Sequence, residues 1–172
     1  MNPSFEMDPV ERITAGAVGE PGERVFFVQA ENAGGQVTLL AEKEQVAALA
    51  TALEQILQTL PETEEGPPPG EETLNLIEPV EPVWRAGSMS IEYDETADKI
   101  TITISEAVAE DAEEEPATAR FVASRSQVRA LSEHAGEVVA AGRPRCQFCG
   151  DPLGPDGGHV CPAMNGHRAP PE

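Results

Sequence analysis

Aromatic residues are scarce in this chain of 172 residues, which holds five phenylalanines, one tyrosine and one tryptophan. Aliphatic side chains must therefore form most of the core, and a hydrophobic content of 40% is enough for a modest one. The 15 glycines and 16 prolines indicate that part of the chain is linker. Length and composition together predict one compact domain with an appendage, and they exclude two large domains.

Basic residues are scarce as well: 11 lysines and arginines stand against 31 acidic residues, and the formal net charge is −20. Because such a charge repels phosphate backbones and anionic membranes, we expect no nucleic-acid partner and no membrane binding. No apolar run approaches the roughly 18 residues that would span a bilayer. Residues 1–8 have neither the basic nor the apolar region of a secretory signal. We therefore expect a soluble, cytoplasmic protein.

One sequence pattern occurs twice. Residues 38–49 align without a gap with residues 120–131. Five positions are identical, namely Ala41 and Ala123, Gln45 and Gln127, Val46 and Val128, Ala48 and Ala130, and Leu49 and Leu131. Lys43 and Arg125 also match in charge. In both copies the pattern runs from a strand directly into a helical pattern, which predicts an internal duplication of one supersecondary unit.

Each copy is predicted to contain three strands followed by one helix. Strands are expected at about 13–18, 24–30 and 36–41 in the first copy, and at about 88–93, 99–105 and 118–123 in the second. Helices are expected at about 43–59 and 125–140, where apolar residues recur at helical spacing. The expected fold class is therefore α+β, with a pseudo-symmetric antiparallel sheet covered by two helices.

The predicted duplicated domain covers residues 1–141. It holds repeat one at about 12–60, an acidic linker rich in proline and glycine at about 61–82, and repeat two at about 84–141. The linker is expected to be solvated, and a second acidic stretch at 106–115 is expected to be a charged surface loop. Residues 142–172 differ abruptly in composition and are predicted to form a separate tail that is similar to a zinc ribbon.

The tail contains all three cysteines of the chain. Cys146 and Cys149 are separated by two residues and followed by glycine, an arrangement that points two thiolates at one cation. His159 and Cys161 follow ten residues later, and on an extended segment their side chains point the same way. These four residues predict a structural zinc site, because four protein ligands leave no open position for catalysis. Metal binding would also supply the folding free energy of a tail that has no core of its own.

Two alternatives stay open for the tail. His167 is an alternative fourth ligand, because the Asn-Gly turn before it can fold it back toward the site. The cysteines could instead be free or redox-active thiols, although such a CxxC motif normally opens a helix and this one is followed by glycines and prolines. Asp151 and Asp156 precede proline and glycine, and we interpret them as turn residues rather than general bases.

Three segments, at residues 16–30, 142–153 and 158–167, are similar to the domain-of-unknown-function family 3090, an uncharacterised group common in actinobacteria. Members are described only as hypothetical or repeat proteins, so the resemblance implies no reaction. The family motif falls on Cys146, Cys149, His159 and Cys161, whereas Ala163 stands where similar sequences have a basic residue. Members are often encoded beside a histidine-phosphatase-like and a phosphatidylinositol-kinase-like protein, which are the partners that the resemblance implies.

Familiar catalytic motifs are absent: the sequence has no GxSxG elbow, no phosphate-binding glycine loop followed by Lys-Ser or Lys-Thr, and no HExxH. Outside the tail the only histidine is His134, expected on the surface of the second helix. We therefore expect a non-enzymatic zinc-binding protein that acts as a protein-interaction or adaptor module. One alternative is an enzyme or enzyme subunit that acts with the phosphatase-like or kinase-like neighbour. The other, a zinc ribbon that binds nucleic acid through Arg143, Arg145 and Arg168, is disfavoured by the net charge.

Overall fold

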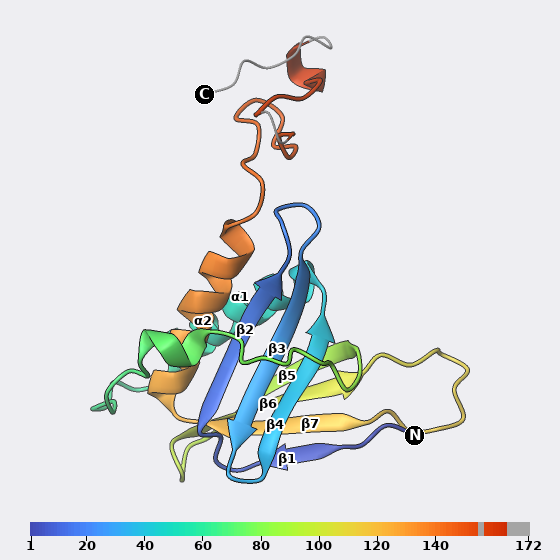
Figure 1. Ribbon diagram of the computed structural model, residues 1–172. Coiled ribbons are helices and arrows are strands. Elements are labelled where there is room, and N and C mark those ends of the chain that lie inside the picture. The colour runs from blue at the N-terminus through green and yellow to red at the C-terminus, as the bar shows by residue number, and fades with distance from the viewer. Residues whose placement is uncertain (155–156, 165–172) are drawn as a thin grey trace.

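The computed structural model describes residues 1–154 and 157–164 and has an α+β fold (Figure 1). Its strands are β1 (Phe5–Met7), β2 (Arg12–Val18), β3 (Val25–Asn32), β4 (Gly35–Ala41), β5 (Ala86–Asp94), β6 (Lys99–Glu106) and β7 (Thr118–Ala123). Its helices are α1 (Lys43–Thr59), α2 (Arg125–Ala140) and two short 3-10 helices, η1 (Glu71–Leu74) and η2 (Pro162–Met164). None of these helices is long and apolar enough to cross a membrane.

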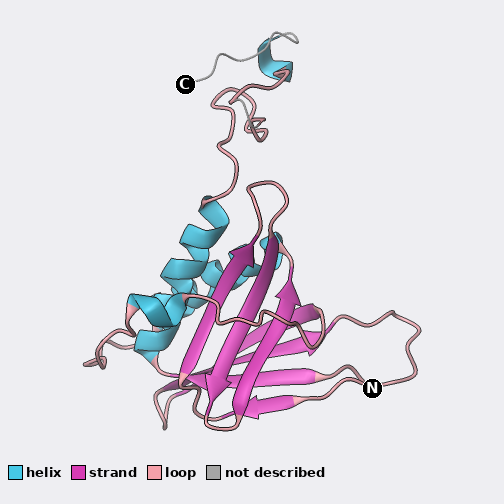
Figure 2. Ribbon diagram, in the orientation of Figure 1, coloured by secondary structure: helices cyan, strands magenta, loops and turns pink. Residues whose placement is uncertain are grey.

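The seven strands form two sheets, in the orders β1-β7-β6-β5 and β2-β3-β4. The expectation of one antiparallel sheet is therefore wrong. Strand β1 pairs with β7 in parallel, and the edge of β4 meets the chain before β5 through an isolated bridge between Leu40 and Arg85 and a hydrogen bond from the N–H of Val83 to the carbonyl of Thr38. In Figure 2 the strands of the three-stranded sheet run steeply upward, whereas those of the four-stranded sheet run across behind them. The strands of the two sheets thus run in crossing directions, and the sheets are separate.

The core between the sheets and helices draws on both predicted repeats, at about 12–60 and 84–141, which are called the two copies below. Val46 and Leu53 of α1 and Val128 and Leu131 of α2 are fully buried in it. Helix α1 packs against α2, and α2 also packs against β2, which belongs to the other copy. The two copies therefore share one hydrophobic core.

The repeated glutamines Gln45 and Gln127 make matching hydrogen bonds. Each side-chain oxygen accepts from the backbone N–H of the residue that caps its own helix, at 2.8 and 2.9 Å. Each side-chain nitrogen donates to two consecutive carbonyls at the entrance to the other copy: Ala86 and Gly87 for Gln45, and Val10 and Glu11 for Gln127. Both glutamines therefore cap a helix and tie that helix to the opposite copy.

Residues 71–77, which we call the strap, lie across the outer face of the three-stranded sheet (Figure 1). The expectation that 61–82 is simply a solvated linker is wrong for this part. Arg12 donates to the carbonyl of Asn75 at 3.0 Å, and Gln29 exchanges two hydrogen bonds with the backbone of Ile77. Gly16 leaves room for Leu76, whose Cγ lies 2.6 Å from where a Cβ would be. Buried polar side chains of the sheet therefore satisfy the backbone of the strap.

Candidate metal centre

The first half of the candidate centre is a tight turn that follows α2. Arg145 and Pro152 pair as an isolated antiparallel bridge, and the N–H of Cys146 donates to the carbonyl of Asp151 at 2.8 Å. The N–H of Gly150 donates back to the carbonyl of Cys146 at 2.8 Å, with a φ of +77° that favours glycine. This turn places the side chains of Cys146 and Cys149 on the same side.

The second half returns through a glycine-rich turn. The N–H of Gly154 donates to the carbonyl of Gly158, and the N–H of Gly157 donates to the carbonyl of Gly154, both at 2.9 Å. Cys161 is fully buried, and Cys146 is 4% exposed. Leu153 packs against this small cluster. Among the described residues of the tail, this apolar cluster consists of Leu153 and the three cysteines.

The structure brings the four predicted ligands together: one ligand atom from each of Cys146, Cys149, His159 and Cys161 lies within 4.8 Å of the others. The sulfurs of Cys146 and Cys161 are 3.8 Å apart, and the sulfur of Cys149 is 3.6 Å from Nε2 of His159. A tetrahedral zinc ion with Zn–S of about 2.3 Å and Zn–N of about 2.0–2.1 Å would separate two sulfurs by about 3.8 Å and a sulfur and a nitrogen by about 3.5 Å. The four residues can therefore hold a metal ion of this size.

The two cysteines of the first turn differ in acidity when no metal is bound. Backbone N–H groups of Cys149 and Phe148 lower the pKa of the Cys146 thiol to about 6, against the opposing effect of burial. Burial raises the pKa of the Cys149 thiol to about 12, and the neighbouring sulfurs of Cys161 and Cys146 add to this rise. The thiolate of Cys146 is thus available near neutral pH. The thiol of Cys149 loses its proton most readily when a cation binds.

Other residues considered in the sequence lie outside this group of four. Asp151 approaches the sulfur of Cys149 at 3.5 Å through a carboxylate oxygen, so it is a neighbour of the cluster. His134 lies half-buried on α2 and is not part of the cluster. His167 and Asp156 lie outside the described residues, and His167 as a fourth ligand stays a prediction.

Two apolar side chains beside the cluster were not recognised as functional candidates from the sequence. Phe148, between the two cysteines of the first turn, is 55% exposed, and Val160, between His159 and Cys161, is 72% exposed. Val160 alternates with His159 and Cys161 along the chain, so it faces outward when these two ligands face the metal, whereas Phe148 is carried on the tight turn between Cys146 and Cys149. Their positions between paired ligands are the sequence signal that would have identified them.

Comparison with known families identifies the family of this chain. The sequence profile of a family described as Protein of unknown function (DUF3090) matches residues 5–161, and the chain belongs to this family. The match spans both copies of the repeat and includes the four clustered residues of the tail. No curated protein and no solved structure matches the chain.

Proposed function

We propose that this chain is a zinc-binding protein-interaction module whose tail folds around one structural zinc ion. The observation that carries the proposal is the convergence of three sulfurs and one imidazole nitrogen within 4.8 Å. Thiolate and imidazole ligands suit zinc, and four protein ligands make a closed site rather than a catalytic one. The ion would cross-link the two turns of the tail, because the buried residues there are chiefly the ligands.

Elemental analysis of the protein, purified without a chelator, tests this proposal. We expect close to one zinc per chain, and we expect Cys149→Ser to lose zinc and make the tail sensitive to protease while the domain melts unchanged. His159→Cys should keep zinc, because a thiolate replaces the imidazole, whereas His134→Ala is a matched control outside the cluster. Retention of zinc by His159→Ala but not by His167→Ala would identify His167 as the fourth ligand. Metal-free protein with its cysteines in disulfides would refute the zinc site.

The interaction role is supported by the exposed apolar side chains beside the cluster. Phe148 and Val160 are held at the surface by the same turns that carry the ligands, and aromatic residues are enriched at protein interfaces. The histidine-phosphatase-like and phosphatidylinositol-kinase-like proteins are the first partners that we propose.

An affinity pull-down from the native cell, with and without chelator, tests the interaction role. We expect a defined partner that is lost after chelation and in Phe148→Ser. Val108→Ser is the matched control, since Val108 is 44% exposed in the loop between β6 and β7. Recovery of the same partner by Phe148→Ser and by chelated protein would show that the tail does not carry the interaction.

We further propose that the two copies arose by duplication and are related by pseudo-symmetry. The matching hydrogen bonds of Gln45 and Gln127 support this proposal, as does the order of three strands and one helix in both copies. The chain that precedes the three strands of each copy also pairs in an equivalent way, with the last strand of the other copy. The parallel pairing of β1 with β7 corresponds to the parallel bridge between Leu40 and Arg85.

A further inference from the structure

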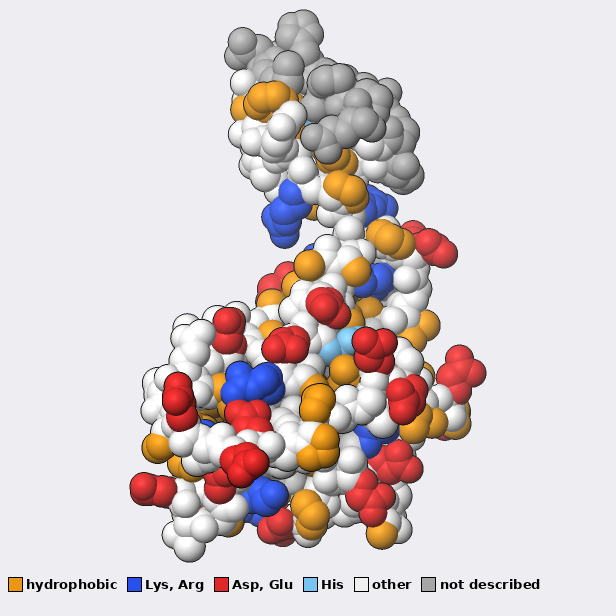
Figure 3. All heavy atoms as spheres, turned by 90° about the vertical axis from the view of Figure 1, so that its left-hand side faces the viewer, with side chains coloured by type: hydrophobic (Ala, Val, Ile, Leu, Met, Phe, Trp, Pro, Cys, Tyr) orange, Lys and Arg blue, Asp and Glu red, His pale blue; other side chains and the backbone are white. Residues whose placement is uncertain are grey.

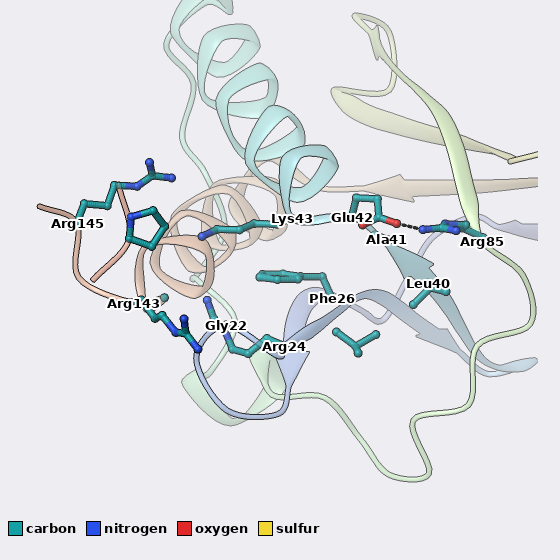
Figure 4. Close-up of a pocket in the computed structure, with 13 residues that line it drawn as sticks. Gly22, Arg24, Phe26, Leu40, Ala41, Glu42, Lys43, Arg85, Arg143 and Arg145 are labelled. Atoms are coloured by element: carbon teal, nitrogen blue, oxygen red, sulfur yellow. Dashed lines mark hydrogen bonds and ion pairs between the residues drawn. The ribbon is translucent and has the colours of Figure 1, made fainter. Parts of the chain in front are cut away.

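A cavity of about 560 Å³ lies where the domain meets the tail (Figure 4). Five of the eleven basic residues of the chain line it: Arg24, Lys43, Arg85, Arg143 and Arg145. We call it the basic cavity. In Figure 3 basic side chains also gather at this junction, whereas acidic ones are spread over the domain below. A chain of net charge −20 therefore places nearly half of its basic residues around one hollow site.

Most of these cations lack a carboxylate partner. Glu42 is the only acidic residue of the described part of the chain that lines the basic cavity, and it pairs with Arg85. Among the described residues, no ion pair with a carboxylate involves the other four cations, which are Arg24, Lys43, Arg143 and Arg145. The guanidinium of Arg143 donates through Nε to the carbonyl of Pro21 at 3.1 Å, so its two terminal nitrogens stay available. The cavity thus holds four positive charges that no carboxylate among residues 1–154 and 157–164 pairs with.

The cations surround a shared open space. Nζ of Lys43 and Nη2 of Arg24 lie 3.1 and 3.4 Å from the point that a Cβ on Gly142 would occupy. Figure 4 shows Lys43 reaching from the start of α1 toward the tail, where Arg143 and Arg145 lie. Like charges that lie this close to one point repel one another. A ligand that carries several negative charges would relieve the repulsion and bind.

The size and walls of the basic cavity define the class of ligand. Its volume falls within the range of about 300–1,000 Å³ that is typical of small-molecule sites. Val25, which is 45% exposed, and Leu40 give one wall an apolar surface that can contact an organic group. An extended polyanion would also meet the acidic surface outside the cavity, whereas a compact anion would not. The ligand is therefore small.

We propose that the basic cavity binds a small phosphate-bearing molecule of the diphosphate class. Diphosphate carries enough charge and enough oxygen acceptors to contact several of the four unpaired cations at once. Arg24 and Lys43 come from the folded domain, so this half of the site does not depend on the zinc proposed for the tail, to which Arg143 and Arg145 belong. The start of α1 at Lys43 adds the positive end of a helix dipole on the same side of the cavity.

Isothermal titration calorimetry with inorganic pyrophosphate at low ionic strength tests the proposal. We expect saturable binding of one pyrophosphate per chain. Lys43→Gln should weaken it by about tenfold, the effect of losing one charge-assisted hydrogen bond. Lys99→Gln is the matched control: it changes the net charge equally but lies outside the basic cavity, and it should bind as the wild type does. Arg143→Gln, at an exposed position that leaves the core intact, should also weaken binding by about tenfold.

Three outcomes would overturn the proposal. The first is a wild-type protein that shows no saturable binding of pyrophosphate. The second is an equal loss of affinity in Lys43→Gln and Lys99→Gln, which would reflect overall charge rather than a site. The third is displacement of pyrophosphate by duplex DNA at equal phosphate concentration, which would indicate a surface for extended polyanions. Melting temperatures of all variants, measured beside the titrations, separate lost binding from lost folding.

Discussion

Gln29 ties the strap to the three-stranded sheet, and Gln29→Leu tests how strongly this contact stabilises the fold. The side chain is fully buried. Its nitrogen donates to the hydroxyl of Thr38 and to the carbonyl of Ile77, both at 3.0 Å. Its oxygen accepts from Arg12 at 2.5 Å and from the backbone N–H of Ile77 at 2.8 Å. Leucine has a similar volume but can make none of these four hydrogen bonds.

The expected loss follows from which partners are left without a hydrogen bond. Thr38 and Arg12 are 3% and 8% exposed, so water cannot easily replace Gln29 at either one. Each unsatisfied buried group costs about 1–3 kcal/mol. Because Arg12 keeps its bonds to Glu31 and to the carbonyl of Asn75, we expect a total near the lower end, about 3 kcal/mol. For a chain of this size that corresponds to a melting temperature lower by about 6–12 °C.

Urea unfolding followed by circular dichroism measures the loss, with Gln55→Leu on the exposed face of α1 as the matched control. A protease that cleaves after glutamate adds a local measurement, since Glu71 and Glu72 lie in the strap. We expect faster cleavage there in Gln29→Leu than in the control, before global unfolding. If Gln29→Leu unfolds within about 0.5 kcal/mol of the wild type and its strap is cleaved no faster, the hydrogen bonds do not hold the strap.

Two further predictions concern the shared core and the dependence on pH. Val46→Asp and Val128→Asp should each unfold the whole domain, since both side chains are fully buried, whereas Ala48→Asp on the exposed face should not. Loss of only half the dichroism would show that the two copies fold independently. A hydrogen bond from Arg125 lowers the pKa of Asp98 below its usual 3.8. The carboxylate therefore stabilises the fold above about pH 4. This contribution is lost as the pH falls through the lowered pKa. Unfolding free energies measured from neutral to acid pH should therefore fall less steeply for Asp98→Asn, and curves parallel to the wild type would contradict the prediction.

Local patterns account for the parts of the fold that the sequence predicted. Both helices have the expected bounds because each has an apolar stripe and a glutamine at the third helical position that caps the first turn. By contrast, β1 has only three residues and pairs with β7, more than a hundred residues away, so no local pattern predicts it. The strap was missed for a related reason. Its composition is that of a solvated linker, and its partners Arg12 and Gln29 have the polarity of surface residues.

The candidate metal centre was predictable because its residues lie close together in the sequence. Spacing alone selected Cys146, Cys149, His159 and Cys161, and turns of a few residues bring them together. The sequence could not supply the sulfur distances or the opposite pKa shifts of the first two cysteines. These depend on which backbone N–H groups and which sulfurs the folded turns bring near each thiol.

The basic cavity shows why a net charge does not describe every site on a protein. The value of −20 is a sum over the whole chain, whereas an anion responds to charges within about one Debye length, roughly 8 Å at physiological ionic strength. The cations come from residues 24, 43, 85, 143 and 145, and only folding brings them together. The same charge distribution would therefore repel a long nucleic acid and attract a compact phosphate. The expectation that nucleic acid does not bind and the proposal of a small anionic ligand follow from this one arrangement.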